Sequence, residues 1–183
     1  MTCLLFKLLT QEVNILFPFT NRTISPSQHQ PLLDGIIIHE IPYQQARDKV
    51  EERIAQWREF LSHDALGRNR FLLVAEDDAR LVGFVAGGPP RREVPGFESQ
   101  LWSIYVLASH RARGLGRALF VACTRRLREA GFRSMALFTP VRNAEARLFY
   151  ERLGGVVVQE SRRMVGTVEM HSVAYGWREL GSL

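Results

Sequence analysis

The arginine- and glycine-rich stretch Arg111–Arg117 directly follows an apolar run and has the composition of an anion-binding turn. Gly114 and Gly116 carry no side chain, so the backbone can bend sharply there and approach a ligand. The free N–H groups in the first turn of a following helix, together with the helix dipole, favour an anion at that point. Arg111 and Arg113 lie at the same end, where cations gain little unless an anion binds. The pattern predicts a phosphate-binding turn.

Two familiar phosphate loops are excluded by residue type. A P-loop has a Lys after its second Gly, and Arg117 stands at that position here. A dinucleotide-binding fingerprint has a third Gly or Ala where Leu119 stands. The remaining pattern, Arg111-x-x-Gly114-x-Gly116 after an apolar strand, resembles the acyl-CoA pyrophosphate turn of the GNAT superfamily of N-acetyltransferases.

The resemblance implies acetyl-CoA as co-substrate and no metal. It assigns the cofactor contacts of this region to the end of the strand and to the whole turn, which are Tyr105, Val106, Leu107, Arg111, Ala112, Arg113, Gly114, Leu115, Gly116 and Arg117.

A second motif lies downstream, between a helix start signal at Asn143 and a stop signal at Gly154. On a helix, Asn143, Ala146 and Tyr150 lie on nearly one line. By residue type alone, Asn143 is a plain N-cap and Tyr150 a core aromatic residue. The spacing also resembles the family's Asn-x-x-Ala-x-x-x-Tyr-x-x-x-Gly segment. That resemblance implies that Asn143 and Tyr150 both contact the cofactor and that Tyr150 is the general acid.

The family's reaction is direct attack of an amine on the thioester carbonyl, so it needs no protein nucleophile. We therefore assign no role to Cys123, which lies on the apolar face of the helix that follows the turn. Family members often hold a Glu near the start of the strand before the turn, and Gln100 stands there in this chain. Glu98, two residues earlier and expected on the same strand face, is the candidate general base. A solvated loop carboxylate at Glu98, with proton removal through water, is the alternative.

Hydrophobic periodicity and turn signals predict an α/β fold with a mixed, mostly antiparallel sheet flanked by helices. The family resemblance adds that the central strands splay apart to hold CoA. The expected helices cover 43–62, 116–130 and 143–153, and the expected strands cover 71–76, 81–86, 100–107, 134–139, 156–160 and 168–177.

The 183 residues fit one domain, with 46% hydrophobic and 23% charged residues. The resemblance covers residues 36–180, whereas residues 1–35 form an atypical N-terminal segment. Two apolar runs, 3–9 and 13–19, are candidates for the first strand. The first run is too short and wrongly charged for a signal peptide or a membrane anchor, so we expect a cytoplasmic protein that does not bind membranes.

The net charge of +5 is compatible with nucleic acid, but equally with the phosphates of CoA. Nucleic-acid binding is therefore a minor alternative. The expected acceptor is a small-molecule or peptide amine, and the expected assembly is a monomer or a homodimer. An acyl-CoA-binding regulatory module without turnover is the main alternative, favoured if Gln100 marks the loss of a catalytic base.

Overall fold

The computed structural model describes residues 5–8, 69–77, 80–165 and 168–182. The helix predicted at 43–62 and the apolar run 13–19 lie outside this part of the chain. The described strands form one seven-stranded sheet with the order β1-β2-β3-β4-β5-β7-β6. The strands are β1 (Leu5–Leu8), β2 (Phe71–Asp77), β3 (Arg80–Gly88), β4 (Ser99–Val106), β5 (Met135–Pro140), β6 (Val156–Val165) and β7 (Val168–Trp177).

Only β4 and β5 pair in parallel, and the other neighbouring strands pair antiparallel. This confirms the predicted mixed, mostly antiparallel sheet. The first apolar run, 3–9, supplies the edge strand β1, which pairs with β2.

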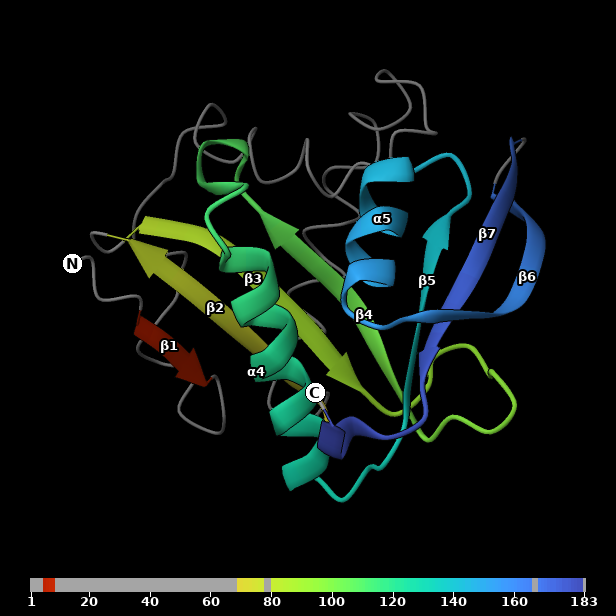
Figure 1. The fold of residues 1–183 in the computed structure, drawn as a ribbon, viewed down its shortest axis with the longest axis horizontal. Helices are drawn as coiled ribbons and strands as arrows, with labels where there is room; N and C mark the ends of the chain where they lie inside the picture. The colour runs from red at the N-terminus through yellow and green to blue at the C-terminus, as the bar shows by residue number, and fades with distance from the viewer. Residues whose placement is uncertain (1–4, 9–68, 78–79, 166–167, 183) are drawn as a thin grey trace.

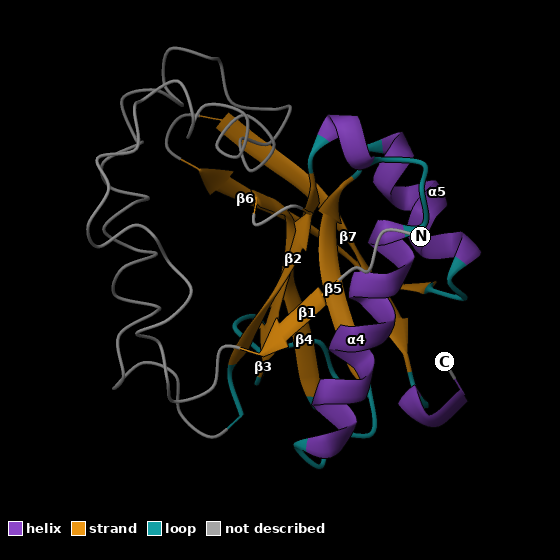
Figure 2. Cartoon of the chain, turned by 90° about the vertical axis from the view of Figure 1, so that its left-hand side faces the viewer, coloured by secondary structure: helices purple, strands orange, loops and turns teal. Residues whose placement is uncertain are grey.

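Two α-helices, α4 (Leu115–Glu129) and α5 (Ala144–Arg152), lie on the same side of the sheet (Figure 2). Short 3-10 turns occupy Ala108–His110 and Leu180–Ser182. In the described part of the chain, no helix is long and apolar enough to cross a membrane.

The main core forms between these helices and the sheet because α4 repeats apolar residues at helical spacing. Cys123 is buried on that face as predicted, and burial raises the pKa of its thiol. Thr124 is buried on the same helix, and its hydroxyl donates to the Val121 carbonyl at 2.9 Å. A hydroxyl satisfied within its own helix can enter the core at little cost.

Strands β4 and β5 pair at only two positions, Ser99 with Met135 and Gln100 with Ala136. Beyond those positions they diverge toward their carboxyl ends (Figure 1). The backbone ladder between β4 and β5 therefore ends after two positions, as the splayed strands of the resemblance implied, and this break in the sheet is called the notch below. On its other side β4 pairs with β3, but a bulge at Trp102 interrupts this ladder.

Candidate active site

The chain leaves β4 through the short 3-10 turn and enters α4 through residues 111–114. Ala112 and Gly114 have positive φ angles of 57° and 83°. Glycine adopts this conformation freely, whereas alanine does so rarely. Residues in the left-handed region next to right-handed ones turn successive N–H groups toward one side, and such a concavity binds anions.

The backbone N–H groups of six consecutive residues, Ala112–Arg117, donate to no acceptor in the described part of the chain. The first bond of the helix is the one from the Ala118 N–H to the Gly114 carbonyl, at 3.0 Å. Unpaired donors at a helix start, with the dipole behind them, are the elements of a phosphate site.

The three arginines of the turn differ in their contacts. Arg111 donates from Nε to the Val106 carbonyl at 3.3 Å, and its Nη1 lies 3.8 Å from the Glu145 carboxylate on α5. Arg113 and Arg117 are exposed and make no ion pair with the described residues. Arg111 therefore ties the turn to β4 and α5, while the other two leave their charges available to an anion.

The two glycines of the turn have different structural roles. Gly114 caps α4 in the left-handed conformation, and no atom lies within 4 Å of where its Cβ would be. Gly116 has no positive φ, and its Cβ would lie 3.4 Å from the Phe149 ring. The bend predicted for both glycines is thus found at Gly114, whereas Gly116 makes room for the contact between α4 and α5.

Asn143 is the N-cap of α5, as one of the two interpretations of its residue type predicted. Its Oδ1 accepts a hydrogen bond from the Ala146 N–H at 3.1 Å. Capping uses the amide oxygen only, so the Nδ2 group can still donate to a ligand.

Tyr150 lies on the inner face of α5 and is only 7% exposed. Its ring meets Phe149 edge-on at 5.3 Å between centroids and Trp177 at 6.3 Å. Burial, with a smaller contribution from the neighbouring Cys123, raises the pKa of Tyr150 above its usual value. The phenol therefore stays protonated at neutral pH, which a general acid requires.

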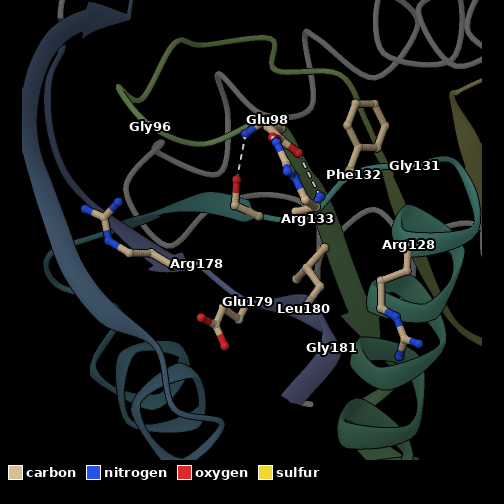
Figure 3. A pocket seen from close by; sticks show the side chains of 11 residues that line it. Gly96, Glu98, Arg128, Gly131, Phe132, Arg133, Arg178, Glu179, Leu180 and Gly181 are labelled. Carbon is tan, nitrogen blue, oxygen red and sulfur yellow. Dashed lines mark hydrogen bonds and ion pairs between the residues drawn. The ribbon is translucent and has the colours of Figure 1, made fainter.

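The structure places the Glu98 carboxylate beside Arg133 (Figure 3), not at the turn. Its carboxylate accepts from the Arg133 N–H at 2.7 Å and from the Arg133 Nη2 at 3.1 Å. These bonds hold the pKa of Glu98 below its usual value. Arg133 follows the carboxyl end of α4, and the turn precedes the other end, roughly 22 Å away along a 15-residue helix.

The prediction that Glu98 and Gln100 share a strand face relied on strand alternation, but β4 begins only at Ser99. Gln100 is buried, and its Oε1 accepts from the N–H groups of Arg91 and Arg92 at 2.8 and 3.1 Å. The amide thus fixes the loop between β3 and β4.

The resemblance assigns cofactor contacts to the strand end before the turn, residues 105–107. One of its N–H groups, that of Leu107, is already bonded to the Val82 carbonyl at 2.9 Å. Tyr105 is buried and Val106 is half-buried at the diverging end of β4. Among the described residues, no group of three or more His, Cys, Asp or Glu side chains could hold a metal.

A mixed sheet with parted central strands, next to a turn of unpaired amides, defines the architecture of a GNAT-type acetyltransferase. The model of the acetyltransferase (GNAT) family matches residues 36–155, and this chain belongs to that family.

The relatives agree with this assignment. The chain is 32% identical over 113 residues to the uncharacterized N-acetyltransferase YuaI of Bacillus subtilis, covering 61% of this chain and 65% of that protein. It therefore spans just under two thirds of that relative. A GNAT-family structure from Desulfovibrio desulfuricans superposes with a TM-score of 0.68 at 20% identity, covering 98% of this chain and 100% of that one. The structure of the yncA protein of Salmonella typhimurium with acetyl-CoA superposes with a TM-score of 0.61 at 17% identity. The match covers 96% of this chain and 93% of that one.

Proposed function

We propose that this protein transfers the acetyl group of acetyl-CoA to a primary amine by direct attack within a ternary complex. The observation that carries the proposal is the row of six unpaired N–H groups at Ala112–Arg117, directly after the strand that borders the notch. The acetyl-CoA in the yncA structure, which has the same fold, supports this co-substrate.

In this proposal the pyrophosphate lies on the amides of the turn, and the Arg113 and Arg117 guanidinium groups balance its charge. The pantetheine arm enters the notch along the diverging end of β4, at Tyr105, Val106 and Leu107. The Nδ2 group of Asn143 donates to the same arm. Leu115 and Gly116 contribute backbone amides only.

The chemical step needs no covalent enzyme intermediate. The amine nitrogen forms a bond to the acetyl carbonyl carbon, the carbon–sulfur bond breaks, and the thiolate of CoA takes the proton of the Tyr150 hydroxyl. The nitrogen releases its extra proton to water, and the Tyr150 phenolate regains a proton from water. A free thiol and a free phenol differ modestly in pKa, about 8.5 against about 10. Burial raises the pKa of Tyr150, and it would also raise the pKa of a CoA thiol formed beside it. The difference between the two pKa values therefore stays modest.

The ammonium form of the acceptor must lose a proton before attack. Glu98, our candidate base from sequence, is a poor one here because Arg133 binds its carboxylate and lowers its pKa. Gln100 cannot accept a proton at neutral pH. We therefore propose that the proton leaves through water.

A screen of primary amines that follows release of the CoA thiol tests the proposal. The expected result is thiol release that depends on one class of amine and matches the acetylated product one to one. A regulatory module that binds acyl-CoA without turnover is the second candidate, because neither Glu98 nor Gln100 is suited to act as a base. Acetyl-CoA binding without thiol release with any amine would favour that module.

A further inference from the structure

The loop between β3 and β4 is fixed on the face of the sheet opposite α4 and α5. Val94 and Phe97 of this loop are buried in a small cluster with Ala136 and Ala174. Gln100 holds the loop's backbone from β4. Side chains carried by this loop therefore have defined positions on that face.

The loop places two guanidinium groups at the opening of the notch. The Cζ atom of Arg91 lies 4.0 Å from the centroid of the Trp102 ring, and that of Arg92 lies 3.6 Å from the Phe138 ring. Trp102 on β4 and Phe138 on β5 each lie two residues beyond the last paired positions of these strands. Stacked cations thus flank both sides of the notch, away from the side of the helices.

Arg92 has a hydrogen bond but no carboxylate partner in the described part of the chain. Its Nη2 donates to the Ser161 Oγ on β6 at 2.7 Å. Arg163 lies two residues further along β6, on the same strand face, and also has no ion pair there. Burial, and then the charge of Arg163, lower the pKa of Arg92. An anion between the two would remove this repulsion.

We propose that Arg92, supported by Arg163, binds a carboxylate on the acceptor; this inference rests on the acetyl transfer proposed above. The preferred substrates are then primary amines that carry a carboxylate. A guanidinium offers five N–H donors in a plane that matches a carboxylate, and the bond to Ser161 uses one of them. Stacking on Phe138 uses the flat face of the group, so its other N–H donors have no partner among the described residues.

The test compares each amino acid of a panel with its carboxamide, at saturating acetyl-CoA. The parent protein is expected to acetylate the carboxylate form with the higher kcat/KM. Arg92→Gln should lower that value about 10- to 100-fold for the carboxylate and much less for the amide. Arg92→Lys should recover part of the preference for the carboxylate over the amide. Arg162 is exposed on the other face of β6, so the control Arg162→Gln should keep the whole preference.

The ratio between the two acceptors separates recognition from folding, because a loosened loop would slow both equally. Equal kcat/KM values for carboxylate and amide in the parent, or an unchanged ratio in Arg92→Gln, would overturn the proposal. Failure of the proposed acetyl transfer itself would look different, since no amine, with or without a carboxylate, would release the CoA thiol.

Discussion

At the scale of single residues, Tyr150, a buried phenol on the inner face of α5, is the proposed general acid. If it protonates the thiolate, Tyr150→Phe should reduce kcat by about 10²–10⁴-fold with little change in acetyl-CoA affinity. Because burial raises its pKa, the acid stays protonated as the pH rises. Up to about pH 10, the ordinary pKa of tyrosine, the parent's kcat should therefore not fall through deprotonation of Tyr150.

Tyr175→Phe is the matched control for this change. The Tyr175 hydroxyl donates to Glu151 at 2.6 Å and accepts from Arg147 at 3.2 Å, so its removal should lower stability and leave kcat near the parent's. Steady-state kinetics across pH, with thermal unfolding of both variants, make the comparison. Turnover of Tyr150→Phe within a factor of two of the parent would show that water protonates the thiolate.

At the scale of elements, the turn between β4 and α4 joins the strand that borders the notch to the helix that closes the core. Gly114 and Gly131, near the two ends of α4, both have positive φ and open space around the missing Cβ. A valine at either position is strained by a similar amount, about 1–2 kcal/mol. Only at Gly114 would the added side chain occupy the proposed phosphate site.

Acetyl-CoA at a hundredfold excess over its Kd should stabilise the parent by about 2.7 kcal/mol. Gly114→Val should lose this stabilisation, and Gly131→Val should keep it, although both start from a lower melting temperature. Thermal unfolding with and without acetyl-CoA measures the difference. The same ligand-induced shift in both variants would refute a role for the turn in binding.

The elements were largely predictable because their signals are local. Asn143 and Gly154 mark the limits of α5, and the apolar spacing of α4 gives its buried face. The bulge at Trp102 was not predictable, since no Gly or Pro marks it. The partners of Glu98 and Gln100 were also missed, because Arg133 and the β3–β4 loop reach them through tertiary contacts.

At the scale of the whole molecule, the sheet brings together two motifs that lie about 30 residues apart in the chain. An exposed ion pair between Arg111 and Glu145 lies between the turn and α5, and the missing side chain of Gly116 leaves room for the Phe149 ring. Sequence spacing indicated each motif separately, and the family resemblance placed them in one site. The stacked arginines on the opposite face had no sequence signal, because the pairs Arg91–Trp102 and Arg92–Phe138 form only in the folded sheet.

Amide hydrogen exchange over the whole chain, with and without saturating acetyl-CoA, tests whether the cofactor binds at the turn. The six N–H groups of Ala112–Arg117 are unpaired in the described structure, so they should exchange fast in the free protein. In the complex they should become the most strongly protected part of the loops, because phosphate oxygens accept their hydrogen bonds. If acetyl-CoA stabilises the protein while these six amides exchange as fast as before, the cofactor binds elsewhere and the proposed site is wrong.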